Sequence, residues 1–210
     1  MTELLYEKFE TLKQISTYEK LDEYITSVRD KIIGKPINKI MVFGTVYTDD
    51  RGYYTFKDGS WYSHKWKIGN LIEYAKEEQG PSFDGSAVEN VDLLLDEPAI
   101  LFIGDNRFEI DYPDVSNAKI AMNTVMLDKY SDRPDYLKDV SKYYSKNIIG
   151  HNVTEIEINK TDSIPIFSKV EYSKDDTRYN EIYFVLDNGY KLEISFWTDY
   201  MLLSEVKNEI

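Results

Sequence analysis

A nine-residue pattern that occurs twice is the feature of this sequence that most constrains its fold. Residues 32–40 read Ile-Ile-Gly-Lys-Pro-Ile-Asn-Lys-Ile, and residues 148–156 read Ile-Ile-Gly-His-Asn-Val-Thr-Glu-Ile, with matching apolar positions and the same glycine. In each copy a segment with helical periodicity precedes the glycine, and a β-rich segment follows it. Glycine often ends a helix because it tolerates the left-handed conformation of the cap. The pattern therefore predicts two junctions, each leading from a helix into a strand.

Both segments before the glycine have apolar residues at helical spacing. In residues 17–33 the apolar side chains recur every three or four positions, and Ser16 with Glu19 fits a capping box. A second helix is expected to begin near Asp132 or Ser131 and to end at the second junction. Its predicted apolar stripe consists of Leu137, Val140, Tyr144 and Ile148. Residues 3–14 show the same spacing and predict an extra N-terminal helix.

Three hairpins are expected where alternating β-rich runs flank turn residues that accept a positive φ. They span residues 53–66, 99–112 and 181–196, and their turns are Asp58-Gly59, Gly104-Asp105-Asn106 and Asn188-Gly189. Further strands are predicted around Ile120 and over residues 153–159 and 164–172. A short helix is predicted after Ile68, whereas residues 88–97 fit neither helix nor strand clearly.

These elements predict an α+β protein built from two tandem helix-plus-antiparallel-sheet units. The first unit, with the extra helix, would span residues 1–126 and carry an insertion at about 50–97; the second would span 132–210. An internal duplication explains the repeated junction, and chance is the alternative, because few residues are identical. In either case each unit has one amphipathic helix that can cover one face of an antiparallel sheet.

The charge and composition of the chain narrow its class of partner. The 210 residues carry a formal net charge of -13 and include no cysteine. This negative field disfavours nucleic acid and anionic membranes and suits another protein, in particular a basic one. Disulfides, thiolate zinc sites and a cysteine nucleophile are excluded. No apolar run has the length of a signal peptide or a membrane span, so we expect a cytoplasmic location.

The segment between Arg51 and Lys67 is the strongest candidate for a binding surface. It combines four basic side chains and one acidic side chain with many aromatic ones. Because strand residues alternate between faces, one face could pack on the core while the other presents aromatic anchors to a partner. The alternative, which the pattern favours, is a plain aromatic core with lysines in solvent. The predicted binding residues are Tyr53, Trp61, Tyr62, His64, Lys65 and Trp66.

Little in the sequence points to catalysis, a metal or a cofactor. There are only two histidines, and His151 at the second junction is expected to be an exposed turn residue. Glu109 and Asp111 alternate with apolar residues, which predicts a solvated strand face rather than a catalytic pair. No catalytic residues, metal ligands or cofactors are therefore predicted.

Three functional classes fit these features. The leading interpretation is a non-enzymatic module that sequesters another protein, because small acidic immunity and inhibitor proteins share its general character. A hydrolase that uses carboxylates or a metal together with His64 is the alternative. A structural or regulatory subunit with two pseudo-symmetric units is the third.

Overall fold

The described part of the chain is mixed α+β and mostly sheet. The structure is a computed structural model, and it describes residues 14–15, 17–43, 50–56, 61–66, 88–95, 99–111, 118–124, 137–161, 178–196 and 201–208. Within strands β3, β4 and β5 it describes the backbone alone. The helical elements are α2 (Tyr18–Ile32) and the short 3₁₀ helix η2 (Ser141–Tyr144).

The described strands form two antiparallel sheets. The first sheet has the order β1-β8-β7-β6-β2-β9, and the second has the order β10-β11-β12-β13-β5-β3-β4. The strands of the first are β1 (Gln14–Ile15), β8 (Ala118–Met122), β7 (Asn106–Asp111), β6 (Ala99–Ile103), β2 (Ile37–Phe43) and β9 (Leu137–Asp139). Those of the second are β10 (Val153–Thr161), β11 (Arg178–Leu186), β12 (Tyr190–Phe196), β13 (Met201–Lys207), β5 (Val88–Leu95), β3 (Asp50–Phe56) and β4 (Trp61–Trp66).

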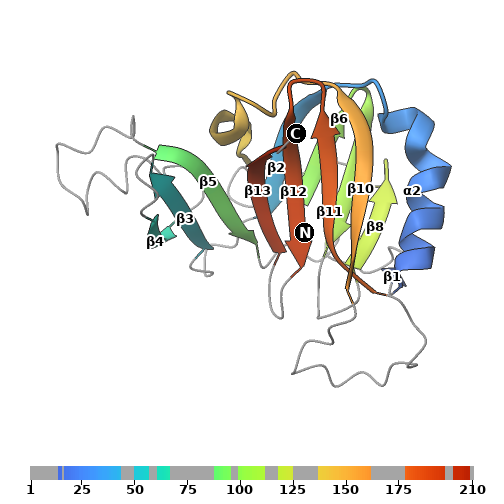
Figure 1. The fold of residues 1–210 in the computed structure, drawn as a ribbon, viewed down its shortest axis with the longest axis horizontal. Helices are drawn as coiled ribbons and strands as arrows, with labels where there is room; N and C mark the ends of the chain where they lie inside the picture. The colour runs from blue at the N-terminus through green and yellow to red at the C-terminus, as the bar shows by residue number, and fades with distance from the viewer. Residues whose placement is uncertain are drawn as a thin grey trace.

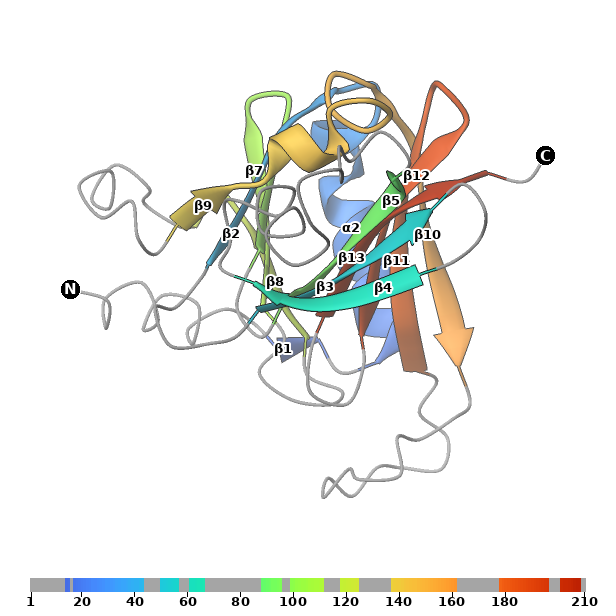
Figure 2. The same ribbon diagram turned by 90° about the vertical axis from the view of Figure 1, so that its left-hand side faces the viewer.

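The two sheets face each other and share one core. Figure 1 looks onto β10–β13 with the first sheet behind them, and β5, β3 and β4 extend the second sheet to the left. Figure 2 shows α2 in the space between the sheets on the far side. Phe108 of β7 and Phe184 of β11 meet edge to face, with ring centroids 5.3 Å apart, and both are fully buried. Apolar burial between the layers therefore holds the sheets together.

Helix α2 confirms the helix predicted over residues 17–33. Its apolar stripe is buried, as the periodicity requires, and consists of Leu21, Ile25, Val28 and Ile32. The expected capping box was wrong, because Thr17 is the N-cap and its hydroxyl accepts from the Lys20 N–H at 3.4 Å. Ser16 lies outside the described residues.

The two predicted junctions lie side by side and exchange equivalent hydrogen bonds. Gly34 donates to the Val153 carbonyl at 2.8 Å, and Gly150 donates to the Ile37 carbonyl at 2.8 Å. Both glycines have positive φ, 74° and 87°, which favours glycine over any residue with a Cβ. In the same reciprocal way, Ile37 N–H donates to the His151 carbonyl and Val153 N–H to the Lys35 carbonyl.

The strands after each junction follow the same course. β2, β6, β7 and β8 pair in succession, as do β10, β11, β12 and β13. Ile37 is paired with Ile103, and Val153 is paired with Leu186. The ladders β2–β6 and β10–β11 both shift register two residues after these starting points, at Lys39 and Glu155. Positions can therefore be matched between the two sheets by counting from Ile37 and Val153.

The second predicted helix was wrong. Leu137 belongs to strand β9, which pairs with the end of β2, and only the single 3₁₀ turn of η2 follows it. Ile40 N–H donates to the Ser141 hydroxyl, which fixes this turn against β2. Tyrosine, serine and asparagine dominate residues 141–147, and none of them favours a helix strongly. Val140, Tyr144 and Ile148 are nevertheless buried, so the apolar spacing located core residues correctly.

The other predicted strands and hairpins are largely confirmed where the structure describes them. All three predicted hairpins are present as β3–β4, β6–β7 and β11–β12. The strands predicted near Ile120 and over 153–159 are β8 and β10, the ambiguous segment 88–97 contains β5, and β13 was missed. The predicted helices at residues 3–14 and after Ile68, and the strand at 164–172, lie outside the described residues. The division into units 1–126 and 132–210 stays a prediction.

Glu205 is a buried carboxylate at the edge of the core. It is 8% exposed and accepts a hydrogen bond from the Asn147 amide, beside the Tyr144 hydroxyl that donates to the Leu203 carbonyl. Burial raises the pKa of Glu205 above its ordinary value of 4.5, although the Asn147 hydrogen bond and the Lys146 charge oppose this shift. The ionised form is therefore less favourable in the folded state than in the unfolded chain.

Glu205→Gln is expected to raise the free energy of unfolding at pH 7 by about 1 kcal/mol, because the amide keeps the hydrogen bond and removes the buried charge. Since the folded pKa is raised, the destabilisation by Glu205 disappears as the pH falls through that pKa. The gain should therefore vanish below the unfolded value of 4.5. Urea unfolding at both pH values tests this, with the exposed Glu155→Gln as a matched control that should change nothing. A gain that persists in acid would contradict it.

Candidate functional site

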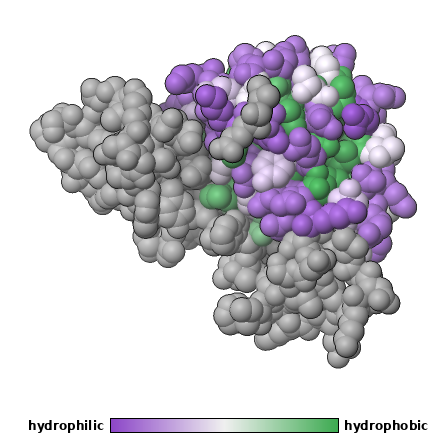
Figure 3. Space-filling view, in the orientation of Figure 1, coloured by the Kyte–Doolittle hydropathy of each residue, from purple (hydrophilic) through white to green (hydrophobic). Residues whose placement is uncertain are grey.

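The outward side of strands β10–β12 carries a cluster of charged residues that we call the acidic face. Ile182, Phe184, Leu192 and Ile194 point into the core, so the residues between them point outward. The cross-strand register brings these outward positions together. The acidic face consists of Glu157, Glu181, Tyr183, Lys191 and Glu193. Figure 3 shows this side of the molecule, where hydrophilic residues dominate between smaller apolar areas.

Tyr183 lies at the centre of the acidic face. Its hydroxyl donates to the Glu181 carboxylate at 2.7 Å, and Glu193 is its direct cross-strand neighbour. Burial, the hydrogen bond to Glu181 and the surrounding carboxylates raise the pKa of Tyr183 well above its ordinary value of 10.0. The hydroxyl therefore stays protonated at neutral pH and acts as a donor, not as a base.

Lys191 makes an ion pair and a cation–π contact within the acidic face. Its ammonium contacts Glu157 at 2.6 Å and lies 5.3 Å from the centre of the Tyr183 ring. An ammonium between a carboxylate and an aromatic ring gains from both ion pairing and cation–π attraction. One lysine faces three carboxylates, so the acidic face keeps a net negative charge.

Two small hydroxyl residues lie beside Glu193. Ser195 donates to the Glu193 carboxylate, and Ser204 of β13 is the cross-strand neighbour of Glu193. Ser204 is 5% exposed, and its hydroxyl makes no hydrogen bond within the described residues. A buried hydroxyl without a partner costs free energy, so serine at this position lowers the stability of the fold relative to an apolar residue of similar size.

Glu109 corrects the prediction of a solvated strand face in the first sheet. It is fully buried, and its carboxylate accepts hydrogen bonds from both the N–H and the hydroxyl of Thr124. Arg107 lies on the same side of β7, with Nε 3.6 Å from the Glu109 carboxylate. Burial and the Glu109 charge raise the pKa of Tyr24 on α2 to about 12. The alternation of acidic and apolar residues around Glu109 did not indicate that this side of β7 is covered.

The aromatic hairpin predicted as a binding surface lies at the far edge of the second sheet. Backbone pairing runs from Leu202 to Leu94, from Leu94 to Arg51 and from Arg51 to Lys65. The hairpin thus continues the sheet that carries the acidic face. Of the predicted residues, Tyr53 is in β3, and Trp61, Tyr62, His64, Lys65 and Trp66 are in β4. Their side chains lie outside the described part of the structure.

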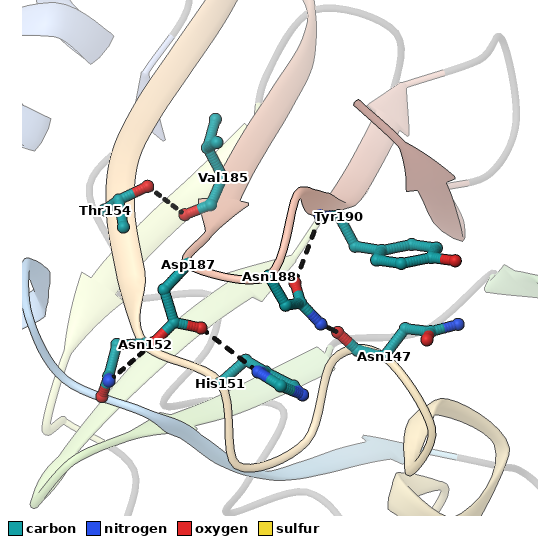
Figure 4. A network of polar contacts seen from close by, with 8 residues as sticks. All are labelled: Asn147, His151, Asn152, Thr154, Val185, Asp187, Asn188 and Tyr190. Carbon is teal, nitrogen blue, oxygen red and sulfur yellow. Dashed lines mark hydrogen bonds and ion pairs between the residues drawn. The ribbon is translucent and has the colours of Figure 1, made fainter. Parts of the chain in front are cut away.

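His151, at the second junction, binds a turn of the second sheet. Its Nδ1 lies 3.2 Å from the Asp187 carboxylate, which also accepts from the Asn152 amide at 2.8 Å (Figure 4). The hydrogen bonds from Asn152 and His151 hold the pKa of Asp187 below its ordinary value. Asn188 donates to the Asn147 carbonyl from the same turn. These contacts fix the β11–β12 turn to the junction.

A small hollow lies beside the first half of α2. Its volume is about 230 Å³, and its lining consists of Ile15, Lys20, Glu23, Tyr24 and Ser27. Its single base and single acid do not form a set of catalytic groups. Over the described ranges, no three histidine or acidic side chains gather where they could hold a metal ion.

No protein-family model, curated protein or solved structure matches this chain. Among the residues that the structure describes, no helix is both long enough and apolar enough to cross a membrane. The functional proposal below is therefore based on the residues of the acidic face. Sequence reasoning missed this face because its acids alternate with apolar residues as in any half-exposed strand, and only the strand register gathers them.

Proposed function

We propose that this chain is a non-enzymatic, cytoplasmic protein-binding module that sequesters a basic protein, in the manner of an immunity or inhibitor protein. The observation that carries the proposal is the acidic face, where three carboxylates surround Tyr183 on one side of a sheet. Complementary charge steers such a partner and selects against acidic competitors.

The form of the surface favours a protein over a small molecule. The acidic face lies on the broad outer side of a sheet, and the polar groups are spread over three neighbouring strands. Small ligands prefer concave pockets that bury most of their surface, whereas a protein can cover a broad face. We include the aromatic hairpin β3–β4 in the proposed surface, since tyrosine and tryptophan are frequent interface anchors.

We also infer that the two sheets descend from one duplicated unit. The reciprocal hydrogen bonds of Gly34 and Gly150, and the register shift at the same place in β2–β6 and β10–β11, support this origin. Under this proposal the second copy specialised for binding, because its outer face carries the cluster of partly exposed charges.

Affinity capture with three baits tests the proposed function. The baits are the wild type, the face variant Glu157→Gln/Glu181→Gln/Glu193→Gln, and the helix variant Glu19→Gln/Asp22→Asn/Glu23→Gln. Each variant removes three carboxylates, so both have the same net charge, and the helix positions are exposed. We expect the wild type and the helix variant to retain one basic protein in stoichiometric amount. The face variant should bind it about 100-fold more weakly, since charge-assisted contacts are lost.

Circular dichroism must show that both variants fold, because misfolding would also abolish capture. Equal weakening by the two variants would mean that net charge alone attracts the protein. Failure of the wild type to retain any protein would contradict the proposal directly.

A further inference from the structure

Within the described residues the two sheets end in four edge strands, and three of these are unsuited to pairing with another chain. β1 and β9 have only two and three residues. β10 is longer, but its ladder with β11 shifts register near both ends, and Glu155 and Lys160 are exposed charges along it. Short length, register shifts and exposed charges are the features by which proteins protect sheet edges from further strands.

Strand β4, at the remaining edge, lacks most of these protections. Its six residues pair with β3 from Trp61 to Trp66 without a register shift. Lys65 is its only formally charged residue, and the strand contains neither proline nor glycine. In the described part of the chain β4 pairs with β3 alone, and Figure 2 shows it in front of β3. Its other edge therefore presents a row of backbone N–H and C=O groups, which is a template for one more antiparallel strand.

The sequence of β4 is suited to pairing with a second copy of itself. In a symmetric antiparallel pair the two-fold axis is perpendicular to the sheet, so residues of the same face lie opposite each other. An axis at His64 places Tyr62 opposite Trp66 of the second copy, and by symmetry this aromatic pair occurs twice. Aromatic cross-strand pairs stabilise an antiparallel ladder. The same axis places Ser63 opposite Lys65 of the second copy, so the lysines of the two copies are not opposed.

Pairing at β4 also keeps the acidic parts of the two copies apart. Each copy carries a net charge of -13, so two copies repel each other at short range. In the order β13-β5-β3-β4, the strands β5, β3 and β4 lie between β13 and the interface. With adjacent strands about 4.8 Å apart, the two β13 strands lie about 34 Å from each other, which is about four Debye lengths at physiological salt. The residues nearest the second copy belong to the basic segment between Arg51 and Lys67.

We propose that two copies of this chain pair through β4 into a symmetric dimer with one continuous sheet. The inference goes beyond the proposed function, because it concerns a second copy and uses a strand edge, not the acidic face. Since the two-fold axis is perpendicular to the sheet, both acidic faces lie on the same side of the dimer. The remaining edges are the short or protected ones, so assembly stops at two copies.

Analytical ultracentrifugation of the intact chain over a range of concentrations tests the dimer. We expect a reversible monomer–dimer equilibrium with a Kd of about 10 µM, as is usual for a small interface. Ser63→Lys should weaken the dimer about 30-fold, because it places a lysine opposite Lys65 of the second copy at two symmetric positions. Ser63→Glu should tighten the dimer about tenfold, since opposite charges then pair at the same positions.

Thr26→Lys and Thr26→Glu are the charge-matched controls, on the exposed side of α2. They should change the Kd by less than about twofold, since they alter the net charge away from β4. Net charge alone would act in the reverse direction, because Ser63→Lys makes the chain less acidic. Tightening by Ser63→Glu also cannot result from misfolding, which circular dichroism checks separately.

A wild type that stays monomeric up to about 1 mM would overturn the dimer. Equal Kd values for the Ser63→Lys and Thr26→Lys variants would likewise exclude β4 as the interface. Weakening by both Ser63 variants would overturn the pairing centred at His64. None of these outcomes affects the capture of a basic protein by the acidic face, so the proposed function is tested separately.

Discussion

Replacing Glu109 with alanine is expected to lower the free energy of unfolding by about 3 kcal/mol, although it removes a charge from an acidic protein. The carboxylate is fully buried and binds both donors of Thr124. Its loss removes both hydrogen bonds and the counter-charge of Arg107, and it creates a cavity at a fully buried position. The Arg107 side chain is 29% exposed, which lets water replace part of the lost ion pair.

Glu193→Ala is the matched control, since Glu193 occupies the corresponding position in the second sheet. It is expected to cost under about 1 kcal/mol, because its carboxylate is only half-buried. Urea unfolding of both variants at pH 7 gives the comparison. Similar losses in the two variants would contradict the interpretation that Glu109 stabilises the fold whereas Glu193 faces solvent.

Phe108→Ala and Phe184→Ala are each expected to lower the free energy of unfolding by about 3 to 5 kcal/mol. The two rings come from different sheets and meet edge to face at the centre of the core. Each truncation leaves a cavity that both sheets would have to move to fill. The double variant should lose about 1 kcal/mol less than the sum, because the ring–ring contact is lost only once.

Chemical denaturation of the two single variants and the double variant gives this coupling directly. Phe102→Ala is the control: this ring is half-exposed on β6, near the Lys39 ammonium. It should cost clearly less than either core ring. Strict additivity of the Phe108 and Phe184 effects would mean that the sheets do not share this contact.

Local signals predicted much of the fold. The periodicity of residues 17–33 gave α2, and the turn dipeptides gave three hairpins, because both depend on neighbouring residues. The segment before Gly150 failed for a tertiary reason: pairing of Leu137–Asp139 with β2 replaced the first part of the expected helix. Strand β13 was missed although it joins β12 to β5.

The candidate site was harder to predict than the fold. Glu157, Glu181 and Glu193 are far apart in the sequence, and each has the exposed-strand pattern of an ordinary surface acid. Only the register of β10–β12 gathers them around Tyr183. Glu109 has the same sequence pattern and is buried, so alternation identifies the side of a strand but not whether that side is covered. The aromatic hairpin, in contrast, stood out in the sequence because its residues are contiguous.

The reciprocal junction bonds also constrain how the chain can fold during synthesis. Gly34 and Ile37 need partners at residues 150–153, and β5 pairs with β13, which lies more than half the chain further on. A nascent chain on the ribosome therefore cannot complete the first sheet before β9 has emerged, or the second before β13 has emerged. Contacts between such distant segments form slowly. Until then, apolar strand edges stay exposed, so production of this protein in cells should depend on chaperones and on low expression temperature.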